Sequence, residues 1–201
     1  MAVLAGGCQD SDLDPDALFD IPTALAVAGS DYDRLFVLNA GQDTIQVVSL
    51  VDGLNTVEFV QSAAVYFPLN IQAGPTASEL AATADGRFVV VLNSATESLH
   101  LIDADAMEVV SADDIPMEIV LGAAGSRPVS MIASPAECDA PCAGRFYISL
   151  AGTGSVAEVM VTEEAGVPTM SVEAVIAVGG SPHHLAITSD GAVLFVSDDA
   201  A

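Results

Sequence analysis

The 201-residue sequence contains no lysine, no tryptophan and only four arginines. Those four basic side chains stand against 28 aspartates and glutamates, so the formal net charge is −24. A chain of this charge is repelled by the phosphate backbone of nucleic acids and by anionic lipid headgroups. We therefore expect no nucleic-acid partner and no docking on a membrane through a basic patch. The acidity itself is interpreted as an adaptation for solubility or salt.

Long apolar runs are also missing. A helix that crosses a bilayer needs about 20 continuous apolar residues, and no segment approaches that length. Hydrophobic residues nevertheless make up 52% of the chain, and the mean hydropathy is +0.54. This composition excludes an intrinsically disordered protein. The chain is long enough to bury a core in one large domain or two small ones.

The sequence is organised as a repeat. Four prolines, at Pro22, Pro75, Pro128 and Pro182, stand 53 or 54 residues apart. Each is followed by a short apolar segment, a turn and a longer β-prone run. First strands are expected at 25–27, 80–82, 131–133 and 185–187, and second strands at 34–39, 87–93, 145–150 and 192–198. Third strands are expected at 44–50, 98–103 and 155–161, and fourth strands at 56–61, at 118–121 and within 170–178.

Local composition favours strands over helices in these runs. They are short, rich in Val, Ile, Phe and Thr, and bounded by Gly, Asp, Asn and Ser. Asp-Gly pairs at 85–86 and 190–191 separate first from second strands, and a third pair at 52–53 separates a third from a fourth. Because Asp-Gly supplies the positive φ of a tight hairpin turn, successive strands should pair antiparallel.

Several short strands per repeat, in repeats of about fifty residues, are typical of a β-propeller. The second strands carry Phe36-Val37-Leu38-Asn39 and Val90-Val91-Leu92-Asn93. With the upstream Pro-x-x-apolar pattern and the Asp-Gly turns, they resemble the YVTN-type β-propeller repeat, named for Tyr-Val-Thr-Asn at this place. The third repeat departs from the pattern, because Leu150 stands where asparagine is expected.

The resemblance implies an all-β fold, an arc of four-stranded antiparallel blades. The blades are expected at 21–73, 74–126, 127–180 and, in part, 181–201. Since propellers close with about four to eight blades, about three and a half blades make an incomplete ring. The full gene product is therefore expected to continue into further blades.

Residues 1–8, ending in Gly-Gly-Cys8, resemble the end of a bacterial lipoprotein signal peptide, in which small residues precede a cleaved and lipidated cysteine. The resemblance implies lipidation at Cys8 and an extracytoplasmic location, in the periplasm or at the cell surface, with an anchor in the outer membrane. The alternative is an ordinary N-terminus with a chance cysteine. Residues 9–20 are acidic and are expected to form a solvated tether to the propeller at 21–201.

Cys138 and Cys142 lie in an enlarged loop between the first and second strands of the third repeat. Outside the cytoplasm, two cysteines this close are expected to form a local disulfide, and free thiols are the alternative. A zinc site would need two further ligands. Covalent haem attachment would need a shorter spacing and a histidine where Ala143 stands.

His183 and His184 begin the expected first strand of the fourth repeat. First strands line the central channel of a propeller, so these side chains are candidates for its mouth. Neighbouring strand residues point to opposite faces, so one imidazole is expected in the channel and the other between blades. Without a bulge the two cannot bind one metal ion. The sequence therefore assigns no catalytic, cofactor-binding or metal-binding residue.

Three functions fit these observations. The favoured hypothesis is a non-catalytic extracytoplasmic propeller, a binding or scaffold module without a cofactor, whose partner is an unidentified protein or small molecule at the propeller face. The alternative is a propeller enzyme, either a lactonase-like hydrolase or a haem d1-type redox domain, with its site at the channel. A structural surface or adhesion protein is the third. Because a fold does not determine function, the scarcity of Arg and His decides in favour of binding.

Overall fold

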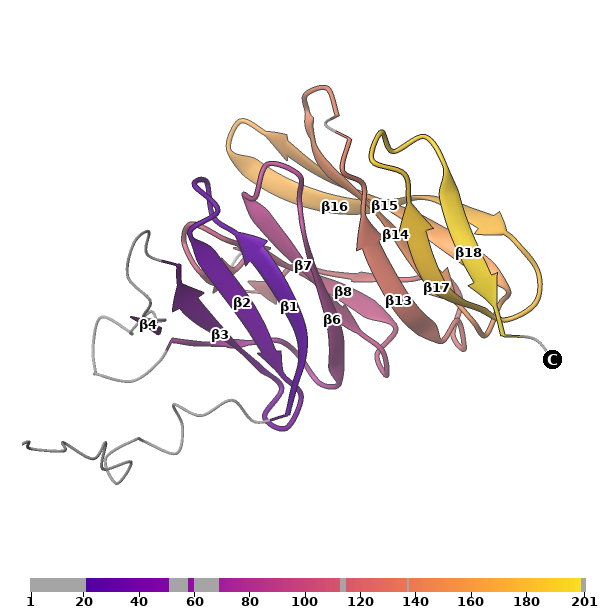
Figure 1. The fold of residues 1–201 in the computed structure, drawn as a ribbon, viewed down its shortest axis with the longest axis horizontal. Helices are drawn as coiled ribbons and strands as arrows, with labels where there is room; N and C mark the ends of the chain where they lie inside the picture. Colours follow the sequence, from indigo (N-terminus) through magenta and orange to yellow (C-terminus); the bar gives the residue numbers. More distant parts are fainter. Residues whose placement is uncertain (1–20, 51–57, 60–68, 113–114, 137, 200–201) are drawn as a thin grey trace, which may run out of the picture.

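The computed structural model describes residues 21–50, 58–59, 69–112, 115–136 and 138–199 (Figure 1). Within these ranges the chain forms strands and turns and no helix; accordingly, none of the described segments is a helix able to span a membrane. The prediction of an all-β fold is confirmed. The predicted lipoprotein-like segment at 1–8, with Cys8, and the tether at 9–20 lie outside the described residues.

Three antiparallel sheets and a final hairpin follow one another along the chain. The first sheet contains β1 (Pro22–Ala28), β2 (Arg34–Asn39) and β3 (Thr44–Ser49), with β4 (Glu58–Phe59) and β5 (Asn70–Gln72) both paired to β3. The second contains β6 (Ala77–Ala82), β7 (Phe88–Asn93), β8 (Ser98–Asp103) and β12 (Glu118–Val120), with β9 (Glu108–Val109) also on β8. The third contains β13 (Pro128–Ala133), β14 (Cys142–Leu150), β15 (Ser155–Glu164) and β16 (Val167–Ala177). The final hairpin pairs β17 (Pro182–Ile187) with β18 (Leu194–Asp198), and β10 (Ser111–Ala112) pairs with β11 (Ile115–Pro116).

The repeat register needs one correction. The proline spacing makes Pro75 the expected counterpart of Pro22, but the structure gives that place to Ala77. Ala77 pairs with Asn93 as Pro22 pairs with Asn39. Pro75 instead precedes β6 in a turn. The second repeat therefore has two additional residues before its first strand.

The fourth strand of the first repeat also differs from its prediction. Of the expected range 56–61, the structure describes residues 58–59, as β4. A further short strand, β5, occupies the same side of β3. The remaining residues of the expected strand lie outside the described part of the chain.

The two predicted Asp-Gly turns within described segments have the expected backbone. Gly86 and Gly191 adopt φ values of 73° and 70°. In the first turn, Asp85 accepts hydrogen bonds from the Thr83 hydroxyl at 2.6 Å and the Arg87 backbone N–H at 3.1 Å. The turn between β17 and β18 repeats the same bonds with Asp190 as acceptor. The Thr-x-Asp-Gly sequence thus determines both hairpins locally.

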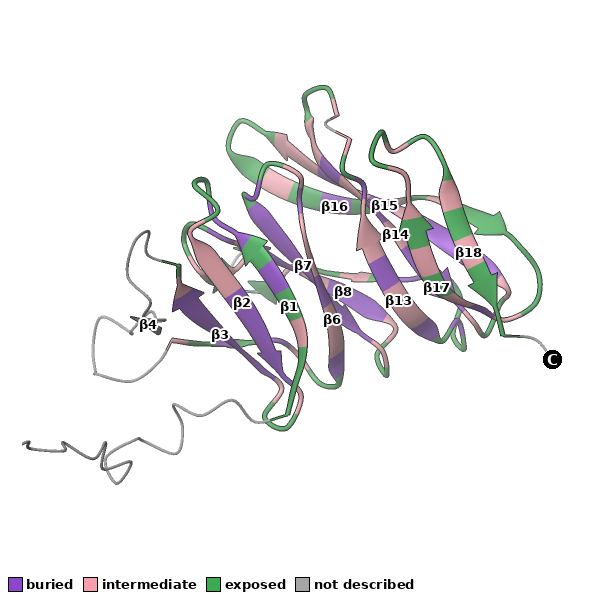
Figure 2. Ribbon diagram, in the orientation of Figure 1, coloured by how far each residue is buried: buried purple, intermediate pink, exposed green. Residues whose placement is uncertain are grey.

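Two apolar layers hold the sheets face to face. One lies between the first and second sheets and the other between the second and third (Figure 2). Strand β7 is buried at every residue, because its side chains enter both layers alternately. Phe36 in the first layer and Phe88 and Phe146 in the second are the largest fully buried side chains. A core built between successive sheets explains why the sequence must repeat.

The first strands of successive sheets lie side by side, in the order β1, β6, β13 and β17 (Figure 1). The sheets therefore converge along this line and together form an arc. Apolar side chains are exposed at both ends of the arc. Among them are Leu25 on β1 and Phe195 on β18, which are 62% and 60% exposed.

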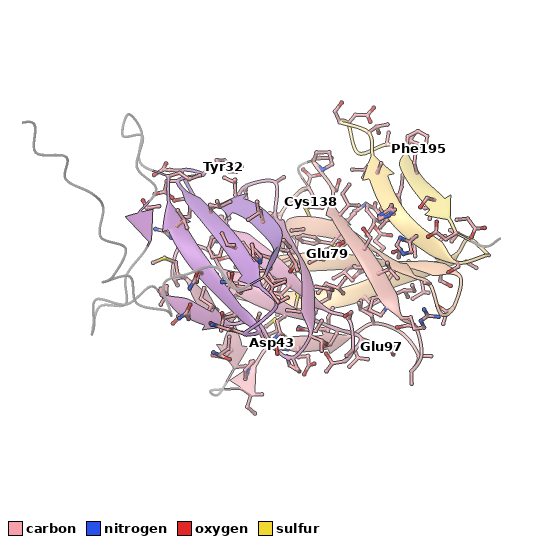
Figure 3. All side chains as sticks on the ribbon, turned by 60° about the horizontal axis from the view of Figure 1, so that its bottom comes forward. Tyr32, Asp43, Glu79, Glu97, Cys138 and Phe195 are labelled. Carbon is pink, nitrogen blue, oxygen red and sulfur yellow. A yellow bond between two sulfur atoms is a disulfide. The ribbon has the colours of Figure 1, made fainter. Side chains whose placement is uncertain are left out.

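Acidic side chains at the β2–β3 and β7–β8 turns bind the segment that enters the next sheet. Asp43 accepts the Thr76 backbone N–H at 3.0 Å. Glu97 accepts the backbone N–H groups of Arg127 at 3.0 Å and Gly125 at 2.9 Å. These hydrogen bonds, that of Arg127 foremost, lower the pKa of Glu97 below its ordinary value. Figure 3 shows Asp43 and Glu97 at one edge of the sheets, opposite the edge that carries Tyr32 and Cys138.

Candidate functional site

The first strand of each sheet, and of the final hairpin, is irregular near its start. In β1, β6, β13 and β17 the register with the second strand shifts within the first few residues. Such a shift marks a β-bulge, which changes the side-chain directions that strict alternation would give. Four residues hold equivalent places at this shift, one in each repeat: Ala24, Glu79, Ser130 and His184. The first three lie just beyond the shift, and His184 lies within it.

Glu79, on β6, is the carboxylate of this group. It is half-buried and accepts hydrogen bonds from the Met131 backbone N–H and the Ser130 side chain, both on the neighbouring β13. Burial raises the pKa of Glu79 above its ordinary value, while these hydrogen bonds and the charges of His184 and His183 oppose the rise without cancelling it. A carboxyl group held in this way is a stronger base than an exposed one and can exchange a proton nearer neutral pH.

His183 and His184 lie together. Nδ1 of His183 is 3.2 Å from Nε2 of His184, and the two rings meet edge to face with their centroids 4.5 Å apart. The expectation that the imidazoles point to opposite faces is therefore wrong. Its physical reason is the bulge between Pro182 and Leu185, which interrupts the alternation on which the expectation rested.

Buried and exposed serines hold the backbone of this pair. The Ser149 hydroxyl donates to the His183 carbonyl at 2.7 Å and accepts the Ser130 N–H at 3.0 Å. The Ser197 hydroxyl accepts the His184 N–H at 2.9 Å. Ser149 is fully buried. The bulge and the positions of both histidines are thus maintained by hydrogen bonds from the second strands.

The structure joins the predicted histidines to residues that sequence reasoning missed. Glu79, Ser130 and Ser149 were not expected at a site, and they reach it from β6, β13 and β14. A usable signal was present, because a glutamate interrupts an otherwise small and apolar first strand in the second repeat. Nothing in the sequence showed that it would act on histidines in the fourth repeat.

Three of the four arginines form ion pairs elsewhere. Arg34 pairs with Asp105, Arg87 with Glu163, and Arg145 with Glu158. The positive charges that act on Glu79 come from the two imidazoles. The chemistry available at the site is therefore that of a carboxylate, two imidazoles and serine hydroxyls.

Cys138 and Cys142 form a disulfide, as predicted, with their Cα atoms 5.5 Å apart. Cys138 lies at the opposite edge of the sheets from Glu97 (Figure 3). Among the described residues, no group of three or more His, Cys, Asp or Glu side chains is arranged to hold a metal ion.

No family model matches the sequence, and no curated protein matches it either. Solved structures do resemble the fold. A provisionally assigned 6-phosphogluconolactonase from Bacteroides uniformis aligns over 88% of this chain and 47% of its own, with a TM-score of 0.62 and 13% identity. A second, from Bacteroides fragilis, aligns over 87% and 46%, with a TM-score of 0.61 and 17% identity. The periplasmic gluconolactonase of Pseudomonas aeruginosa aligns over 88% and 47%, with a TM-score of 0.57 and 16% identity.

The fold is a β-propeller. The stacked sheets are its blades, the last of them represented by the β17–β18 hairpin, and the described residues form an open arc. The chain spans about half the length of the propellers that it resembles. At these identities the likeness concerns the fold alone, so the function has to be argued from the site.

Proposed function

We propose that the protein is a β-propeller hydrolase that opens the ring of a lactone, with its site on the first strands around Glu79. The observation that carries the proposal is the half-buried carboxyl of Glu79, whose pKa is raised by burial although the charges of His184 and His183 act to lower it. Titratable groups with perturbed pKa values are common at catalytic sites. The names of the three similar propellers, all gluconolactonases of one kind or another, support this class of substrate.

The residues supply what lactone hydrolysis needs. The Glu79 carboxylate takes a proton from water as the water oxygen bonds to the carbonyl carbon. An imidazole N–H from His183 or His184 stabilises the negative charge that develops on the carbonyl oxygen. The bond between that carbon and the ring oxygen then breaks, and the ring oxygen receives the proton held by Glu79. The product is a hydroxy acid, and Glu79 is again ionised.

The test is a hydrolysis assay of the full chain with γ- and δ-lactones of sugar acids. The rate is measured from the acid that the reaction releases. Glu79→Gln should lower the rate by roughly 100-fold or more, the usual contribution of a general base. Glu118→Gln is the matched control, because Glu118 lies on β12 and pairs with His100 at 3.7 Å. Equal rates for the wild type and Glu79→Gln would overturn the proposal.

A non-catalytic binding module is the second candidate. Glu79 also bonds the Met131 N–H, and a carboxylate that ties β6 to β13 has a structural use without chemistry. In that case the wild type hydrolyses no lactone. A sugar acid would then bind to the chain and be retained by it, and binding would weaken in His184→Ala.

We also infer that the protein works outside the cytoplasm. The disulfide between Cys138 and Cys142 and the periplasmic name of one similar propeller support this location. The same proposal includes lipidation at Cys8, the YVTN type of the repeat, and blades at 21–73, 74–126, 127–180 and, in part, 181–201. Mass spectrometry of protein from its native host would detect the lipid on Cys8, and an unmodified Cys8 thiol behind a free Met1 would exclude the anchor.

A further inference from the structure

We propose that His183 and His184 bind one divalent transition-metal ion, such as Zn²⁺, through Nδ1 of His183 and Nε2 of His184. The two nitrogens are 3.2 Å apart. Two imidazole nitrogens at the usual Zn–N distance of about 2.0–2.1 Å, with a tetrahedral angle between them, are separated by about 3.3 Å. The pair therefore already has the spacing of two ligands of one ion.

The second ring nitrogen of His183 has a suitable partner. Nε2 of His183 is 3.8 Å from a carboxylate oxygen of Asp199. Histidines that bind metals commonly direct their other ring nitrogen at a carboxylate, which selects the tautomer and orients the ring. With its ring proton on Nε2, beside Asp199, neutral His183 has the lone pair of Nδ1 free for the metal.

The backbone of the pair is held in place before any ion binds. The His184 N–H is bonded to Ser197 and the His183 carbonyl to buried Ser149. His184 is exposed and His183 retains about a third of its side-chain surface, so an ion can reach both rings. Preorganised and accessible ligands lose little conformational entropy when they bind.

The ligand type determines which ions are expected. Imidazole nitrogen suits Zn²⁺, Cu²⁺ and Ni²⁺, whereas Mg²⁺ and Ca²⁺ prefer oxygen. The net charge of −24 will attract all cations to the surface without selectivity. Two protein ligands leave the remaining positions of the ion to water, which agrees with the absence of a three-residue group among the described side chains.

The experiment is calorimetric titration of the tag-free full chain with Zn²⁺ in an excess of Mg²⁺, which occupies the non-selective acidic surface. The reference chain, called the wild type here, and all variants carry Cys8→Ser, because a thiolate is itself a strong zinc ligand. One ion per chain should bind. Either His183→Ala or His184→Ala should weaken binding by on the order of tenfold or more, and Asp199→Asn by a smaller factor.

His100→Ala is the matched control, because His100 is the third of only three histidines and lies on β8 beside Glu118. Its affinity for Zn²⁺ should equal that of the wild type, and thermal melting should show that all variants are folded. Binding unchanged in both His183→Ala and His184→Ala, or no selective Zn²⁺ binding by the wild type, overturns the proposal. Because the readout is binding, selective Zn²⁺ binding without lactone hydrolysis would refute the proposed function and leave this site intact.

Discussion

Ser149→Ala should destabilise the protein although it removes a single oxygen atom. That oxygen is fully buried and makes two strong contacts, one to the His183 carbonyl at 2.7 Å and one from the Ser130 N–H at 3.0 Å. Alanine leaves both backbone groups without this partner. A buried polar group that loses its partner costs about 1–3 kcal/mol, and partial access of water at His183 reduces the sum. We expect a loss of about 2–3 kcal/mol in the free energy of unfolding.

Ser197→Ala is the matched control. Ser197 occupies the equivalent place one blade further on and accepts the His184 N–H at 2.9 Å, but it is exposed, so water can replace its hydroxyl. Its loss should cost about 0.5 kcal/mol or less. Urea unfolding followed by circular dichroism measures both variants. A loss below about 0.5 kcal/mol for Ser149→Ala, or an equal loss for Ser197→Ala, would refute the argument from buried hydrogen bonds.

Three further predictions follow from the charged groups and the turns. Because the pKa of Glu79 is raised by burial, the folded state holds its proton more tightly than the unfolded state. The wild type should therefore lose stability relative to Glu79→Gln as pH rises above about 4.5. Denaturant titrations of both proteins at several pH values measure this. A difference in the free energy of unfolding that does not change with pH would contradict the prediction. The pKa of Glu97 is lowered by its hydrogen bonds. Its contribution to the free energy of unfolding is therefore present above pH 4.5, the pKa of the unfolded state, and is lost as pH falls through the pKa of the folded state. Glu97→Gln should be less stable than the wild type at neutral pH and equal to it in acid, and a deficit that persists in acid would exclude this origin. Gly86→Ala should lower the melting temperature more than Gly166→Ala. Both glycines have positive φ, but of the two only Gly86 would place a Cβ 2.6 Å from a backbone oxygen, that of Gly29. Equal melting temperatures would show that this contact relaxes.

Local sequence was enough to predict the architecture. The β-prone runs and the Asp-Gly turns act over short distances along the chain, so strands and hairpins could be predicted from the sequence, and the period of about fifty residues indicated their repetition. The burial of β7 on both sides matches its sequence, which is apolar from Phe88 to Leu92 and ends in Asn93. The Cys138–Cys142 disulfide could also be predicted, because two cysteines so close in one loop have no need of distant structure to meet.

The site depended on relations that the linear pattern does not contain. Side-chain direction on a first strand depends on its pairing register, and the bulge between Pro182 and Leu185 turned two histidines expected on opposite faces into one pair. The proline spacing predicted Pro75 opposite Asn93, but Ala77 lies there. This register is likewise determined by pairing across the sheet. His183 and His184 act on the pKa of Glu79 from two blades away because the first strands converge. Its raised pKa comes from burial in that convergence, since desolvation is a property of the packed neighbours and not of the residue.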